Sequence, residues 1–304
     1  MTSSPNFATD SDPAAPTGLL ARIGHWAFAR ILVQALVLVV AIAVTSRLIS
    51  LFIPPAPSAL HASLAMARNL FEAGLLLGLY ALMVRWMEGR RASEIDLRAG
   101  AVQWPIGAVL GMGLMTAVYL ILWSLGRATF GAGAGTDGLA AGAVAAFLTA
   151  VFEELLLRAV LFRILEQAFG TTIGLIVSAA VFGLLHGANP GATLFSDAAI
   201  AIEAGLMLAL AYALTRNLWL AIGIHAGWNF TEGSLFGAQV SGGAVSHSLF
   251  HATLTGPLAL TGGAFGPEAS VISIGVSGTL ALAMGALVVR RGGWRPRTFR
   301  LSVI

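Results

Sequence analysis

The sequence contains no cysteine and no lysine, and only 10% of its 304 residues are charged. Without cysteine, the chain has no disulfide framework, no thiolate metal site and no cysteine nucleophile. Without lysine, it has neither a Schiff-base nucleophile nor the lysine of a phosphate-binding loop. Water-soluble domains carry about a quarter charged residues, whereas 57% of this chain is hydrophobic. The composition therefore excludes an ordinary soluble enzyme and predicts a polytopic membrane protein.

Apolar runs long enough to cross a bilayer recur along the chain. A spanning helix needs ~20 mostly apolar residues, and eight segments meet that requirement: 28–50, 68–87, 102–125, 140–164, 172–189, 198–215, 217–234 and 270–289. We therefore expect an all-α fold, a bundle of about eight transmembrane helices within residues 21–292. Residues 1–20 are expected to form a disordered cytoplasmic tail, and residues 293–304 a basic cytoplasmic tail.

All 17 basic residues are arginines, and their distribution predicts the orientation of the chain. When the eight spans alternate from a cytoplasmic amino terminus, 14 arginines lie on the cytoplasmic side and Arg47, Arg68 and Arg127 on the other. The positive-inside rule then places both termini in the cytoplasm. No basic cluster interleaved with aromatic residues occurs in a soluble segment, so no nucleic-acid partner is expected. We expect a multi-pass protein of the cell membrane, and the lysine-free, Ala-, Gly- and Arg-rich composition favours a bacterial inner membrane.

Two glycine-rich segments interrupt the apolar pattern. Residues 131–138 (GAGAGTDG) have no lysine after them and no strand before them, so we expect a flexible loop and not a phosphate-binding site. Residues 233–267 contain no charged residue and many glycines. Dense glycine weakens a helix, so this segment is expected to be a loop or a re-entrant segment and not a ninth span.

The fourth span contains three ionisable residues within six positions, namely Glu153, Glu154 and Arg158. An ionisable side chain in hydrocarbon costs ~2.5–3.5 kcal/mol, so each needs a partner or a function. Glu154 and Arg158 lie four residues apart and are expected to form an ion pair. Glu153 projects about 100° away from that face, and a carboxylate in apolar surroundings can accept and return a proton near neutral pH. The alternative is a single structural salt-bridge cluster of all three residues.

Two further spans each carry a histidine in a four-residue pattern. Phe182 and His186 lie on the fifth span, and His225 and Asn229 lie on one face of the seventh. Small residues let helices approach closely, and three glycines flank these side chains: Gly187, Gly223 and Gly227. A glutamate, two histidines and an asparagine at one interior point would supply a proton acceptor, ligands for a metal or an oxyanion, and an orienting amide. This combination indicates hydrolytic chemistry.

The three motifs EExxxR (153–158), FxxxH (182–186) and HxxxN (225–229), in this order on separate spans, resemble those of a known family. They are similar to the CAAX protease and bacteriocin-processing (Abi) family of intramembrane proteases, which includes the type II CAAX endopeptidases. The resemblance covers about residues 140–235, the expected protease core. It implies hydrolysis of peptide bonds in membrane-anchored or membrane-spanning peptides and proteins within the lipid bilayer.

The resemblance also implies roles for individual residues. Glu153 would activate a water molecule. His186 and His225 would bind that water, stabilise the tetrahedral oxyanion or ligate a metal, and Asn229 would orient the site. The family is often described as metalloproteases, but the HExxH motif is absent here. A divalent metal such as zinc on Glu153, His186 and His225 and a metal-free glutamate mechanism therefore both stay open.

The remaining motif residues are expected to support the site. Arg158 and Phe182 would be structural, and Glu154 would either support Arg158 or act as the base itself, because the sequence does not divide the work between the adjacent glutamates.

Other patterns allow competing functions. The GVSG sequence around Ser277 matches the GxSG of rhomboid serine proteases, but no histidine follows it, so small residues packing the last helix explain it better. His247 and His251 have metal-ligand spacing without a third ligand. Glu72 and Glu203 are buried-acid candidates that would suit a proton-coupled transporter, although no internal repeat supports one. A third alternative is a non-catalytic protein of the bacteriocin-immunity type.

Overall fold

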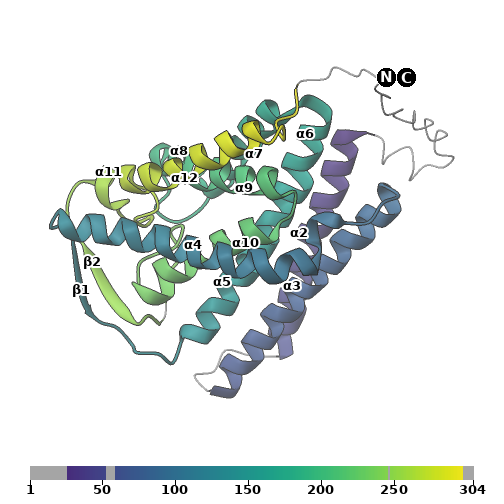
Figure 1. The fold of residues 1–304 in the computed structure, drawn as a ribbon. Coiled ribbons are helices and arrows are strands. Elements are labelled where there is room, and N and C mark those ends of the chain that lie inside the picture. Colours follow the sequence, from purple (N-terminus) through teal and green to yellow (C-terminus); the bar gives the residue numbers. More distant parts are fainter. Residues whose placement is uncertain (1–25, 53–58, 246, 297–304) are drawn as a thin grey trace.

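The computed structural model describes residues 26–52, 59–245 and 247–296, and Figure 1 shows them as a bundle of helices with one short strand pair at an edge. The predicted tail at residues 1–20 lies outside the described residues, as does the end of the predicted tail at 293–304.

The elements follow one another in a simple order. They are α2 (Ala27–Phe52), α3 (Ala59–Met87), the 3-10 turn η1 (Ser93–Ile95), α4 (Leu97–Ser124), β1 (Ala128–Ala132), α5 (Leu139–Glu154), η2 (Leu155–Phe162), α6 (Arg163–Phe169), α7 (Thr171–His186), α8 (Leu194–Ile200), η3 (Ala201–Leu206), α9 (Met207–Thr215), α10 (Trp219–Asn229), η4 (Phe230–Leu235), β2 (Phe250–Leu254), α11 (Leu258–Thr261) and α12 (Val271–Arg290).

Local residues set several helix ends. Asp96 caps α4 by accepting a hydrogen bond from the backbone N–H of Arg98 at 3.0 Å, and Ser270 caps α12 in the same way. Thr193 and Ser196 form a capping box at the start of α8. Gly170 separates α6 from α7 and has a φ of +85°. This backbone conformation strains any residue with a Cβ, so glycine suits the position.

All eight predicted spans fall on helices, which confirms an all-α polytopic bundle. Among the described residues, five helices are long and apolar enough to cross a membrane: Ala27–Phe52, Ala62–Met87, Leu97–Ser124, Leu194–Thr215 and Val271–Arg290. The other three predicted spans fall on α5–η2–α6, on α7 and on α10–η4. The number of eight crossings and the cytoplasmic position of both termini stay predictions.

Glycines bring α4 and α10 into close contact. A Cβ atom on Gly223 would collide with the backbone oxygen of Trp104, and a Cβ atom on Gly227 with that of Ala108. The predicted close approach is thus confirmed at these two glycines, whereas a Cβ atom on Gly187 would meet the side chain of Asp197 on α8 at 3.0 Å. Because the two glycines of α10 flank His225 in the sequence, this contact fixes the helix that carries the histidine against α4.

Three of the long helices contain a π-helical segment. The segment η2 begins immediately after the glutamate pair of α5, η3 contains Glu203, and η4 follows Asn229 directly. The π-helical turns rotate the side chains that follow and are frequent at functional sites. Each of these segments therefore borders a residue that the sequence analysis singles out.

The expected flexible loop at residues 131–138 is wrong in part. Ala128–Ala132 forms β1, which pairs antiparallel with β2, and Phe130 lies opposite Ala252. The ring of Phe130 also packs 5.4 Å from that of Phe236, an aromatic anchor that the glycine count hides. No helix of spanning length occurs in the described part of 233–267, as expected of a loop.

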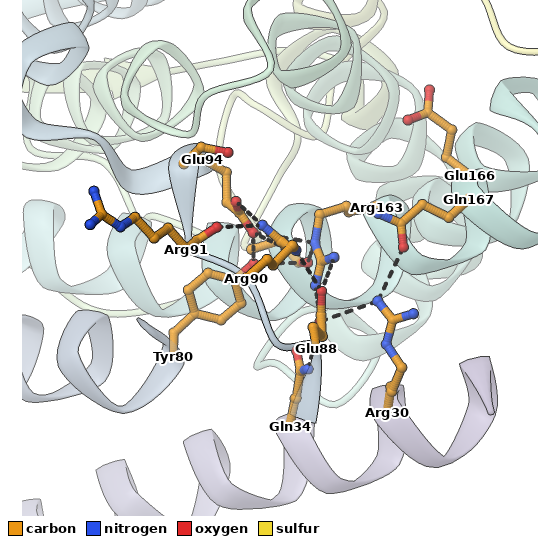
Figure 2. Close-up of polar contacts among 12 residues, drawn as sticks. Arg30, Gln34, Tyr80, Glu88, Arg90, Arg91, Glu94, Arg163, Glu166 and Gln167 are labelled. Atoms are coloured by element: carbon orange, nitrogen blue, oxygen red, sulfur yellow. Dashed lines mark hydrogen bonds and ion pairs between the residues drawn. The ribbon is translucent and has the colours of Figure 1, made fainter. Parts of the chain in front are cut away.

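A cluster of buried ion pairs joins α2, α3 and α6 (Figure 2). The carboxylate of Glu88 accepts two hydrogen bonds from Arg163, at 2.7 and 2.8 Å, and further bonds from Arg90 and Gln34. Arg30 lies 3.1 Å from the same carboxylate. Burial alone would raise the pKa of Glu88, but the hydrogen bonds and charge of Arg163 lower it to about 2. Glu88 is therefore ionised and ties the three helices together.

Two more buried glutamates extend this arrangement. Glu94 accepts hydrogen bonds from Arg90 and from Tyr80, and Glu166 pairs with Arg216. Several arginines that the sequence analysis uses as topological markers are thus also structural partners of carboxylates.

Candidate active site

Glu154 is the buried centre of the glutamate pair. Its side chain is completely inaccessible to solvent, and its Oε1 accepts a hydrogen bond from Nη1 of Arg158 at 3.0 Å. Arg158 also donates to the backbone oxygen of Ala204 on η3 at 2.7 Å. The ion pair expected from the four-residue spacing is present, and it links α5 to η3.

The imidazole of His225 lies between the two glutamates. Its Nδ1 donates a hydrogen bond to Oε1 of Glu154 at 2.9 Å, and its Nε2 lies 3.8 Å from Oε2 of Glu153. The second distance is too long for a direct hydrogen bond, but one bridging water can span it. Glu153 keeps 22% of its side-chain surface exposed, whereas its Oε2 atom is buried and has no hydrogen-bond partner. Glu154 therefore orients the histidine, and Glu153 faces its opposite nitrogen.

Phe182 connects the three motifs by packing. The guanidinium carbon of Arg158 lies over the Phe182 ring, 4.5 Å from the ring centroid. The same centroid is 4.7 Å from the ring centroid of His186 and 6.3 Å from that of His225. The cation–π contact and the edge-on ring contact hold these side chains in place. The FxxxH motif thus uses its aromatic residue to set the distance between the two histidines.

His186 is fixed by its own helix. Its Nδ1 lies 2.8 Å from the backbone oxygen of Phe182. A carbonyl oxygen can only accept, so Nδ1 must donate to it. This bond leaves Nε2 as the atom available to a ligand.

A cavity connects the motif residues. His186, His225 and Asn229 line it together with the ring of Phe182. The volume open to the centre of a water molecule is about 20 Å³, close to the minimum that one water needs. Glu153 is not among the lining residues and borders the site through His225. The structure therefore brings His186, His225 and Asn229 to one cavity and places both glutamates against the imidazole of His225.

Two buried glutamates also line the cavity, and only one of them is named from the sequence. Glu203 and Glu268 line it together with Ser241, and Glu232 lies directly behind Glu268. Glu203 was considered as a buried acid without a motif. Glu232 and Glu268 were missed, although each offers a signal: Glu232 follows Asn229 within an apolar span, and Glu268 is the residue that ends a long charge-free stretch.

The expected metal ligands do not form a metal centre in this arrangement. Among the described residues, no three histidine, aspartate or glutamate side chains are grouped so that they could hold a metal ion. The set of Glu153, His186 and His225 therefore does not fit a zinc ion with three protein ligands. Metal analysis tests zinc binding directly, and no catalytic step below is derived through a metal.

The competing motifs are distant from this chemistry. His247 and His251 are both exposed, and His251 lies on β2 opposite Gly131. Ser277 is buried in α12, where its hydroxyl donates to the backbone oxygen of Ser273 at 2.7 Å. The serine is thus engaged in its own helix, as expected of a packing residue.

Comparison with known proteins adds one match, which covers all three motifs. Residues 135–231 match the family model described as type II CAAX prenyl endopeptidase Rce1-like. No curated protein and no solved structure matches the chain. The matched segment runs from the turn before α5 to the first residues of η4 and so contains Glu153, His186, His225 and Asn229. This multi-pass membrane protein therefore carries, at residues 135–231, the Rce1-like domain of the CAAX protease family, as its motifs predict.

Proposed function

We propose that this protein is an intramembrane endopeptidase that hydrolyses peptide bonds in membrane-anchored or membrane-spanning substrates. The observation that carries the proposal is the imidazole of His225, which is held between two carboxylates at the edge of a cavity that His186 and Asn229 share. The endopeptidase family of residues 135–231 supports the same reaction.

In the proposed reaction Glu153 is the general base. A water between Oε2 of Glu153 and Nε2 of His225 gives one proton to Glu153 and adds to the carbonyl carbon of the substrate. The negative charge that develops on the carbonyl oxygen is stabilised by the side-chain amide of Asn229 and, when the imidazole of His186 carries a second proton, by its Nε2–H group. Glu154 does not exchange protons in this scheme. It accepts the Nδ1–H of His225 and neutralises Arg158, so that the imidazole keeps its orientation.

A membrane-anchored peptide library tests the proposal. The purified protein in detergent is expected to cleave members of the library, and Glu153→Ala and His186→Ala are expected to abolish cleavage while keeping the thermal stability of the unsubstituted protein. Glu72→Ala is a matched control, because Glu72 is a buried glutamate of α3 that does not line the cavity.

Two results would contradict the proposal. Cleavage at the normal rate by either site variant would reject the assigned residues. Uptake of a solute into proteoliposomes, without cleavage of any peptide, would favour a transporter instead.

A further inference from the structure

Three buried glutamates form an acidic wall at the cavity, where Glu203 and Glu268 belong to the lining and Glu232 lies against Glu268. Glu203 comes from η3, Glu232 from η4 and Glu268 from the segment before α12, and their exposed fractions are 2%, 0% and 3%. No arginine of the described chain pairs with any of them. Buried carboxylates without a cation are costly unless they keep a proton.

Glu232 and Glu268 are in direct contact. The backbone N–H of Glu268 donates a hydrogen bond to Oε1 of Glu232 at 3.2 Å, and two buried carboxyl groups that share a site are not both ionised. Oε1 of Glu268 also accepts hydrogen bonds from the backbone N–H and the hydroxyl of Ser241, at 2.6 and 2.8 Å. Burial raises the pKa of Glu268. These hydrogen bonds fix the two residues, which we call the Glu232–Glu268 unit.

Among the three, Glu203 combines a place in the cavity lining with an oxygen that has no partner. Its side chain lines the cavity, and its buried Oε2 makes no hydrogen bond. The titratable groups that face it are His186 of α7, His225 of α10 and the Glu232–Glu268 unit. An unpartnered carboxyl group beside other acids in an apolar cavity is held as the neutral acid. It therefore presents an O–H group to whatever fills the cavity.

We propose that Glu203 is the proton donor to the leaving amine during peptide hydrolysis, a role that rests on the proposed function. Glu153, beside Nε2 of His225, and Glu203, in the lining of the cavity, would then act on the scissile bond from two different elements. One acts as base and the other as acid, a division that two carboxyl groups in different environments can support.

The chemical step balances with these two groups. Water loses one proton to Glu153, and its oxygen bonds to the carbonyl carbon. The C–N bond then breaks, its electron pair goes to nitrogen, and the O–H proton of Glu203 transfers to that nitrogen, which leaves as a neutral amine. The products are a carboxylic acid and an amine. Transfer of one proton from Glu153 to the carboxylate of Glu203 restores the starting state.

A comparison of two leaving groups tests this role. A peptide that the unsubstituted protein cleaves is resynthesised with an ester in place of the scissile amide, since an alcohol leaves with less need of protonation than an amine. Glu203→Gln is expected to lower kcat/KM for the amide by about 100-fold or more and for the ester by much less. A merely structural role of Glu203 would lower both rates by the same factor.

Glu72→Gln is the matched control, because it also removes a buried carboxyl group. Glu72 on α3 is 1% exposed, accepts a hydrogen bond from Ser46 at 2.8 Å and leaves its Oε2 unpartnered, but it does not line the cavity. Its amide-to-ester ratio is expected to equal that of the unsubstituted protein.

A second measurement needs no variant and applies if Glu203→Gln does not fold. With peptidyl anilides of graded amine basicity, the unsubstituted protein is expected to show a weak dependence of kcat on the basicity of the leaving amine, because a donor protonates it. A steep dependence, or equal losses for amide and ester in Glu203→Gln, would overturn the role of Glu203. Failure of the unsubstituted protein to cleave any peptide would instead overturn the proposed function.

Discussion

Neutralising either glutamate of the pair is expected to stop catalysis, but for different physical reasons that can be separated. Glu154→Gln removes the charge that compensates a fully buried Arg158. It also weakens the acceptor that orients His225, because an amide oxygen replaces the carboxylate. Breaking one partner of a buried ion pair costs about 3–5 kcal/mol of folding stability. Glu153→Gln removes a carboxylate that is partly exposed and makes no direct hydrogen bond to His225, so its cost in stability is at most about 1 kcal/mol.

A double variant separates stability from activity. In Glu154→Leu/Arg158→Leu both buried charges are gone, and replacement of a buried pair by apolar residues is often neutral for stability. The double variant is therefore expected to regain most of the stability that Glu154→Gln loses. It is not expected to regain activity, because a leucine at position 154 offers no acceptor to Nδ1 of His225, and loss of such an orienting carboxylate costs at least about 100-fold in rate.

The assay pairs unfolding in mixed micelles, by titration with sodium dodecyl sulfate, with cleavage of the membrane-anchored peptide. Two results would refute the reasoning: an unfolding free energy for Glu154→Gln equal to that of Glu153→Gln, or recovery of cleavage in the double variant. Equal free energies would mean that Glu154 does not carry the buried ion pair, and recovered cleavage would mean that His225 needs no acceptor at Nδ1.

Three further predictions concern stability and metal content. The pKa of Glu88 is about 2 in the folded protein, against an ordinary value of 4.5. Its ion pairs are therefore expected to contribute up to about 3 kcal/mol of folding stability above pH 4.5, and this contribution is lost as the pH falls toward 2. A thermal midpoint that falls with pH in the unsubstituted protein but not in Glu88→Gln would confirm this, and equal slopes would refute it. Gly223→Ala is expected to lower the unfolding free energy by about 1–3 kcal/mol, because its Cβ overpacks against α4. Gly113→Ala is the control and is expected to leave stability unchanged, because a Cβ there meets no atom within 4 Å. Equal thermal midpoints for the two variants would contradict the packing of α10 on α4. Cleavage is expected to persist in the presence of a zinc chelator. The metal-free scheme would be contradicted if elemental analysis found one zinc per chain and removal of that zinc abolished activity.

The helices could be predicted from the sequence because hydrocarbon imposes a simple rule on composition and length. The rule is less accurate at helix ends. In the structure α3 begins at Ala59, nine residues before the predicted start at 68. The predicted start is late because Arg68 lowers the local hydropathy, but its guanidinium is hydrogen-bonded to the side chain of Asn69 at 3.0 Å. Strand β1 is not predicted, because it pairs with β2, which lies more than a hundred residues away. Local sequence patterns do not show which distant segments pair.

The candidate site was predictable where spacing on one helix decides the geometry. The Glu154–Arg158 ion pair and the shared cavity of His186, His225 and Asn229 follow from four-residue spacings on three spans. The placement of His225 between both glutamates does not follow from spacing, because it depends on how α5 and α10 cross. The acidic wall escaped the sequence analysis for the same reason, since its three residues come from separate segments.

The most direct test of the central claim is hydrolysis of a membrane-anchored peptide in water enriched in oxygen-18, followed by mass spectrometry of both fragments. The unsubstituted protein is expected to yield two fragments from one peptide bond, with one oxygen-18 atom in the new carboxyl group, and Glu153→Gln is expected to leave the peptide intact. An intact peptide with the unsubstituted protein, or labelled fragments at the same rate from Glu153→Gln, would contradict the account.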